Sequence, residues 1–68
     1  MSTLGEQLPK EMARVRDEVM PAYAEIGRPG MLALSMMRTD LDRAAEAMVS
    51  GDTVEMLRVY ESLKSYET

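Results

Sequence analysis

The spacing of apolar residues in the first half of this sequence constrains its fold more than any other feature. These residues recur four and three positions apart in alternation, which keeps them on one side of a helix over several turns. They are Leu8, Met12, Val15, Val19, Ala22 and Ile26. Pro9 suits the first turn of such a helix, because its missing N–H is not needed there. We therefore predict a helix over residues 8–26.

Pro21 lies inside this predicted helix. Its ring removes the hydrogen bond to the carbonyl of Asp17 and crowds the preceding turn, so a kink or a short break is expected there. The apolar stripe nevertheless continues in register on both sides of the proline. We predict one helix kinked at Pro21, with two abutting helices as the alternative.

A second helix is expected over residues 31–49. Before it, Gly27 suits the left-handed position beyond a helix C-terminus, and Pro29 and Gly30 fit the central positions of a type II turn. Its first half is apolar around much of its circumference, as a central helix should be. Its stripe comprises Leu34, Met37, Leu41, Ala44 and Met48, widened by Ala33, Met36 and Ala45.

A third helix is expected over residues 53–66. Gly51 is a candidate for the left-handed position after the second helix, and Asp52 is a candidate N-cap. Glu55, three residues after Asp52, completes the pattern of a capping box. The residues that we expect to point inward are Val54, Met56, Leu57, Tyr60 and Leu63.

These elements predict an all-α fold in a single domain over residues 1–68. Because the loops are short, neighbouring helices should be antiparallel, so we expect a small three-helix up-down-up bundle in which helices two and three form an αα-hairpin. A core of this size rarely contributes more than roughly 3–5 kcal/mol. The chain has no Cys and no His, so neither a disulfide nor a zinc site supplements that core. Oligomerisation or a heterologous partner is the remaining way to supplement the core.

The side chains also argue against catalysis. Without His or Cys there is no Ser-His-Asp or Cys-His arrangement, and paired carboxylates would need a cleft that a chain this short does not readily build. Asp40, Asp42 and Glu46 resemble a cation site, but residues two apart on a helix do not share a face. We interpret them as a solvated helix face that includes Arg38 and Arg43. The sequence thus predicts no enzyme, no catalytic residue, no cofactor and no metal.

The net charge of −4 disfavours binding to nucleic acid or to an anionic membrane. The longest uncharged run, residues 29–37, is too short for a membrane span. The N-terminus has neither a basic segment nor an apolar segment typical of a signal peptide. We therefore expect a cytoplasmic protein that does not bind membranes.

The eight methionines are the most suggestive feature for function, since methionine suits adaptable binding surfaces. Several lie off or at the edge of the predicted stripes and should form an exposed apolar patch, which usually marks an interface. If two copies pair, the stripe of the first helix is the natural seam. The candidate interface residues are Met12, Val15, Val19, Met20, Met31, Met36, Met56, Val59 and Tyr66.

The function that we predict is that of a non-catalytic, small, acidic helical interaction module. It should self-associate, with a dimer expected first, or dock on a protein partner through a Met/Leu-rich face. One alternative is an acidic inhibitor of a nucleic-acid-handling protein. The acidic band that motivates it comprises Asp40, Asp42, Glu46, Asp52 and Glu55.

A helix-turn-helix DNA binder is the less favoured alternative. Ala47, Gly51 and Leu57 match the small residue, the turn glycine and the packing residue of that motif. However, Asp52 follows the glycine where an apolar residue is usual, and the third helix is not basic. Nucleic acid is therefore not an expected partner.

Overall fold

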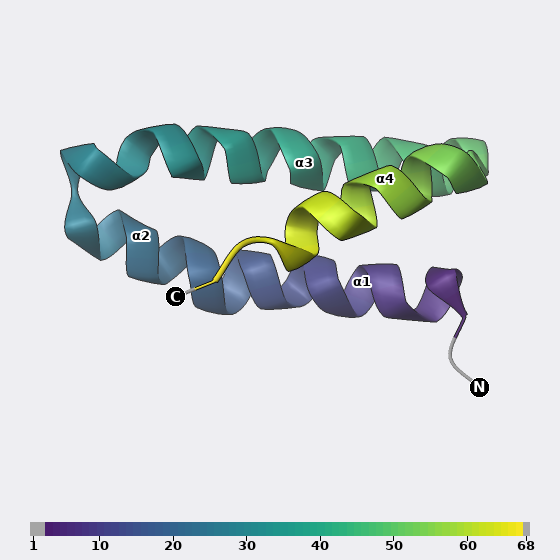
Figure 1. The fold of residues 1–68 in the computed structure, drawn as a ribbon, viewed down its shortest axis with the longest axis horizontal. Helices are drawn as coiled ribbons and strands as arrows, with labels where there is room; N and C mark the ends of the chain where they lie inside the picture. The colour runs from purple at the N-terminus through teal and green to yellow at the C-terminus, as the bar shows by residue number, and fades with distance from the viewer. Residues whose placement is uncertain (1–2, 68) are drawn as a thin grey trace.

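The computed structural model describes residues 3–67, and nearly all of them are helical. A first helical rod runs in one direction, α3 returns beside it, and α4 folds back along α3 (Figure 1). This arrangement confirms the predicted all-α fold and the αα-hairpin of the last two helices. The elements in chain order are α1 (Leu4–Arg14), η1 (Val15–Val19), α2 (Met20–Ile26), η2 (Arg28–Gly30), α3 (Met31–Ser50) and α4 (Thr53–Lys64).

The first rod begins at Leu4, one turn earlier than predicted. The carbonyl of Thr3 accepts the N–H groups of Glu6 and Gln7 at 3.0 and 2.9 Å, which starts the helix before Pro9 is reached. Pro9 therefore lies inside α1 and not in its first turn. The bond that Pro9 cannot make would go to the carbonyl of Gly5, an exposed residue.

Pro21 is accommodated by a π-helical turn, η1, immediately before it. The N–H of Met20 donates to the carbonyl of Val15, five residues back, so the helix absorbs an additional residue before the proline. This local irregularity confirms the predicted kink within one continuous rod. It also rotates the rest of the helix relative to the predicted stripe. Consequently Met20 and Tyr23 pack on the core, whereas Ile26 faces solvent.

The connection between α2 and α3 differs from the predicted type II turn. Gly27 has a positive φ of 81° but a ψ of −140°, so it does not adopt the predicted left-handed conformation. Gly30 has a φ of −87°, where a type II turn requires a positive value. The N–H of Gly30 donates to the carbonyl of Gly27 at 3.0 Å and closes η2 instead. Gly30 is required for another reason: an added Cβ would lie 2.4 Å from the carbonyl oxygen of Tyr23. The start of α3 therefore packs directly against the backbone of α2.

The corner between α3 and α4 largely follows the prediction. Gly51 is left-handed, with φ 71° and ψ 23°, and Asp52 caps α4 by accepting the N–H of Glu55 at 3.1 Å. Only half of the capping box forms, because the N–H of Asp52 donates to the carbonyl of Ala47 at 3.0 Å. The carboxylate of Glu55 is left free to pair with Arg43.

The core lies between the rod and the α3–α4 hairpin. Its buried side chains are Leu8, Val15, Val19, Met37, Ala44, Val59 and Leu63. Two residues predicted to point inward from α4, Val54 and Leu57, are exposed. The inward stripe of α4 instead follows helical spacing from Met56 through Val59 to Leu63.

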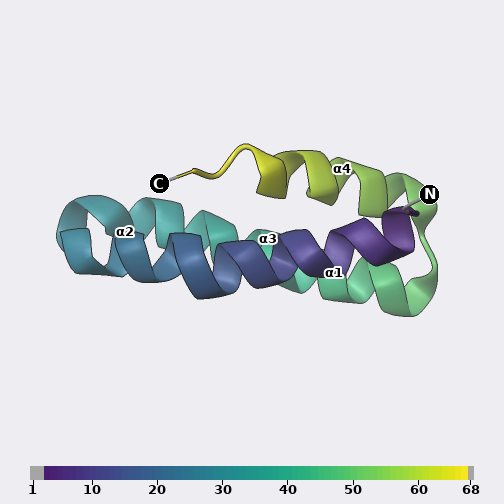
Figure 2. The same cartoon turned by 90° about the horizontal axis from the view of Figure 1, so that it is seen from below.

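At one end of the molecule only the rod and α3 lie side by side, whereas at the other end α4 packs with them as a third helix. α4 begins at the end of α3 and stops well before the turn between α2 and α3 (Figures 1 and 2). The accessible surface is 4682 Å², somewhat above the roughly 4,300 Å² expected of a compact monomer of this mass. Within residues 3–67, no helix combines the length and the apolar character needed to cross a membrane.

Candidate functional site

Large apolar side chains are exposed near the corner between α3 and α4, where Val49, Val54 and Leu57 lie. A second exposed group lies where α4 does not cover the rod and α3. Leu32 is 73% exposed, Met31 62%, Ile26 57% and Met36 52%. Leu32 and Met36 are four residues apart and therefore lie on the same side of α3. Ile26 and Met31 flank the turn that joins α2 to α3. We call these four residues the apolar end.

The structure separates the predicted interface residues into three groups. Met31 and Met36 are exposed and belong to the apolar end. Met12, Met20, Met56 and Tyr66 are half-buried and pack against the core. Val15, Val19 and Val59 are core residues and offer no side-chain surface to a partner in this structure. Their burial follows from their positions on the inward stripes of η1 and α4.

Sequence reasoning missed two members of the apolar end. Ile26 was assigned to the inward stripe because the rotation produced by η1 is not visible in apolar spacing alone. Leu32 precedes the apolar stripe of α3, and the sequence predicts it neither as an inward residue nor as an interface residue. Only the shortness of α4 relative to α3 shows that this end lacks a third helix.

Charge is distributed unevenly along the chain. Residues 20–39, which form the apolar end and its surroundings, contain one acidic and two basic side chains: Glu25, Arg28 and Arg38. Residues 40–68 contain seven acidic and three basic side chains. The net negative charge therefore lies mainly outside the apolar end.

A second feature is a polar cluster around Asp40, between α3 and α4. Asp40 is only 6% exposed, so the prediction of a solvated Asp40 was wrong. Its carboxylate accepts hydrogen bonds from Ser62 Oγ at 2.6 Å, from the hydroxyl of Tyr66 at 2.8 Å and from Arg43 Nη1 at 3.1 Å. Burial raises the pKa of Tyr66, and the hydrogen bond to Asp40 raises it further.

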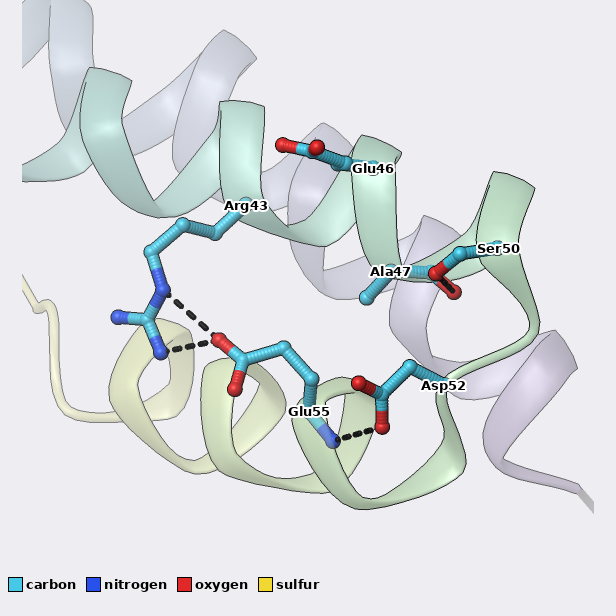
Figure 3. Close-up of a pocket in the computed structure, with 6 residues that line it drawn as sticks. All are labelled: Arg43, Glu46, Ala47, Ser50, Asp52 and Glu55. Carbon is cyan, nitrogen blue, oxygen red and sulfur yellow. Dashed lines mark hydrogen bonds and ion pairs between the residues drawn. The ribbon is translucent and has the colours of Figure 1, made fainter.

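Arg43 extends this cluster along the hairpin (Figure 3). Its Nε donates to a carboxylate oxygen of Glu55 at 2.9 Å, and this hydrogen bond is the main cause of the raised pKa of Arg43. A shallow hollow of about 210 Å³ lies beside the pair, and Glu46 on its rim points away from it. The predicted acidic band is thus divided: Asp40 and Glu55 are paired with Arg43, and Asp52 caps α4.

The polar cluster shows the features of a structural network more than those of a binding site. A hollow of about 330 Å³ lies above Asp40, but each buried side-chain nitrogen or oxygen in residues 3–67 has a hydrogen-bond partner. No polar group is therefore left in need of a ligand there. No cluster of three potential metal ligands occurs in the same part of the chain.

Comparison of the chain with protein-family models, with curated proteins and with solved structures finds no match.

Proposed function

We propose that this chain is a small, non-catalytic helical module for protein–protein interaction, and that the apolar end is its docking surface. The observation that carries the proposal is that Leu32, Met36 and Ile26 are each exposed at the end where α4 leaves the rod and α3 uncovered. Burying a large apolar side chain contributes about 1.5–3 kcal/mol, and exposed apolar patches on small domains commonly mark interfaces. In keeping with the sequence, we propose a cytoplasmic location.

A second copy of this chain is the occupant that we propose. Two helical hairpins that each expose an apolar face can bury it against each other in a four-helix arrangement. Charge favours the same pairing, because Glu25 lies among Arg28 and Arg38 at this end, whereas Glu46, Asp52 and Glu55 lie at the opposite end of the hairpin. Two copies related by a twofold axis through the apolar end would therefore experience little repulsion there.

The test measures molar mass by light scattering during size-exclusion chromatography, over a range of protein concentrations. Leu32→Glu places a charge in the apolar end, whereas Leu57→Glu makes the same change at an exposed leucine on α4. We expect a concentration-dependent dimer whose dissociation constant rises at least about tenfold in Leu32→Glu, because a buried leucine contributes more than 1.4 kcal/mol. Leu57→Glu should behave like the wild type.

Two results would count against this proposal. A wild-type chain that stays monomeric at every concentration would reject the second copy as occupant. Dissociation of the dimer by Leu57→Glu and not by Leu32→Glu would move the surface from the apolar end to α4.

No contact in the described residues specifically favours the two alternatives, a helix-turn-helix DNA binder and an acidic inhibitor of a nucleic-acid-handling protein. α4 folds back beside α3 in both views, whereas the helices of a helix-turn-helix cross steeply (Figures 1 and 2). The acidic band retains Asp42 and Glu46 as its unpaired, exposed carboxylates among the described residues. We therefore do not extend the proposal to DNA binding or to inhibition of a nucleic-acid-handling protein.

A further inference from the structure

The last described residues, 65–67, leave α4 and cross the first helical rod (Figures 1 and 2). We call them the C-terminal segment. Arg14 of α1 reaches this segment, because its Nη2 donates to the carbonyl of Leu63 at 3.1 Å and to the carbonyl of Tyr66 at 2.9 Å. A single guanidinium thus binds both the end of α4 and the segment that follows it.

Two of the three tyrosines complete the attachment of the C-terminal segment. The hydroxyl of Tyr23 in α2 donates to the carbonyl of Glu67 at 3.1 Å. The hydroxyl of Tyr66 donates to Asp40 of α3 at 2.8 Å. The third tyrosine, Tyr60, lies beneath the ammonium of Lys64, and its hydroxyl makes no hydrogen bond to residues 3–67. Side chains from α1, α2 and α3 therefore converge on one short segment.

The C-terminal segment borders the apolar end. Met36 and Tyr66 line the same hollow of about 330 Å³. Tyr23, which the segment contacts, is half-buried and packs against the core together with Met20. Tyr66 also packs against the core and shares this hollow with Met36, so lifting the segment would uncover core surface beside Met36.

The hydrogen bonds that hold the C-terminal segment can break and re-form without unfolding of α4. Ser65 and Glu67 are exposed, and two of the bonds that hold the segment, from Arg14 to Tyr66 and from Tyr23 to Glu67, end on backbone carbonyls. Each such bond contributes only about 0.5–1.5 kcal/mol net, or about 1.5–3 kcal/mol where the charged Arg14 donates, because bonds to water replace it on opening. Leu63, by contrast, is fully buried and anchors α4 independently of the segment. The segment can thus open locally while α4 stays in place.

We propose that the C-terminal segment is a latch that controls access to the apolar end. Closed, it covers Tyr23 and fixes the ring of Tyr66 beside Met36, which limits the apolar surface available to a partner. Open, it enlarges that surface, and a second copy docks on it. This inference rests on the proposed function, since it names the regulation of the same surface.

The three tyrosines allow a matched test in the full chain. The double variant Tyr23→Phe/Tyr66→Phe removes both hydroxyls that hold the latch and keeps both rings. Asp40 retains Ser62 and Arg43 as donors, so no buried carboxylate is left unpaired. Tyr60→Phe is the control, because it removes a hydroxyl that holds nothing in the described part of the chain.

The first readout is hydrogen–deuterium exchange followed by mass spectrometry. In the double variant we expect exchange of residues 20–36 to accelerate about fivefold to tenfold, as the loss of one or two hydrogen bonds predicts. Residues 44–59, at the opposite end, should exchange at the wild-type rate. Tyr60→Phe should leave both regions unchanged.

The second readout is access to the apolar end, followed by fluorescence of an apolar dye and by the dimer dissociation constant. The double variant should bind more dye and dimerise several-fold more tightly, and adding Leu32→Glu should reverse both effects. A monomeric wild type with Leu32-dependent dye binding in the double variant would support the latch and reject only the second copy as occupant.

Three outcomes would overturn the latch. The first is exchange of residues 20–36 that matches the wild type in the double variant. The second is acceleration of equal size in residues 44–59, which would mean general destabilisation. The third is a dimer that Leu32→Glu disrupts but the double variant leaves unchanged, in which case the proposed function stands without the latch.

Discussion

Asp40 illustrates, for a single residue, how a charge is kept inside a small core. It lies on the inner side of α3, between Met37 and Ala44 in helical spacing, and its carboxylate is satisfied by three donors from α3 and from the C-terminal part of the chain. A buried carboxylate is tolerated only when it is paired in this way. Asp40 therefore couples the register of α3 to that of α4.

Removing this carboxylate should be costly. We predict that Asp40→Ala lowers the free energy of unfolding by about 2 kcal/mol, because Ser62, Tyr66 and Arg43 lose their shared acceptor. Asp42→Ala, an exposed carboxylate on the same helix, should change it by less than about 0.5 kcal/mol. Urea denaturation of both variants measures the difference. Equal effects would mean that the Asp40 hydrogen bonds add nothing to stability.

The hydroxyl of Tyr66 should make the stability sensitive to alkaline pH. Burial and the bond to Asp40 raise its pKa above the ordinary value of about 10, so the folded chain holds this proton more tightly than the unfolded chain. This contribution is fully present below the unfolded pKa and is lost as pH rises through the folded pKa. We predict that urea midpoints fall above about pH 10 in the wild type. The fall should be smaller in Tyr66→Phe and unchanged in Tyr60→Phe; identical profiles for all three proteins would contradict the assignment.

Between elements, the contact of α3 with α2 depends on a glycine. A Cβ at Gly30 would lie 2.4 Å from the Tyr23 carbonyl oxygen, so Gly30→Ala must push the two helices apart. We predict a loss of roughly 1–3 kcal/mol in the free energy of unfolding, as for other overpacked contacts. Gly5→Ala is the matched control, since its Cβ would meet nothing closer than 3.8 Å and alanine favours the helix by roughly 0.5–1 kcal/mol. In both thermal and urea unfolding, the midpoint should therefore fall in Gly30→Ala and rise in Gly5→Ala.

The elements also show which parts of the fold were accessible from sequence. The three helical stretches, the left-handed Gly51 and the Asp52 cap all depend on neighbours a few residues away, and all were predicted. The orientation of α4 was not. Val54 and Leu57 compete with Val59 for the inward side, and only the packing of α4 on the rod selects Val59.

For the whole molecule, a short α4 has two consequences. The core is limited to a few buried side chains between the rod and the hairpin, and one end of the two longer helices stays uncovered. The uncovered end carries a slight positive charge, while the rest of the chain carries the negative charge that keeps copies apart. Association through the apolar end would therefore add stability where the fold is thinnest.

The sequence by itself determined where this chain is helical, where it turns and that its surface is acidic overall, because these properties arise from local spacing and composition. The tertiary structure alone decided which carboxylate is buried, how far η1 rotates α2, and which apolar residues remain in solvent. Each of these depends on contacts between residues distant in the chain, such as Asp40 with Tyr66 and Arg14 with Leu63. Apolar spacing predicts a face for each helix, but the partner that covers that face is chosen only when the helices pack.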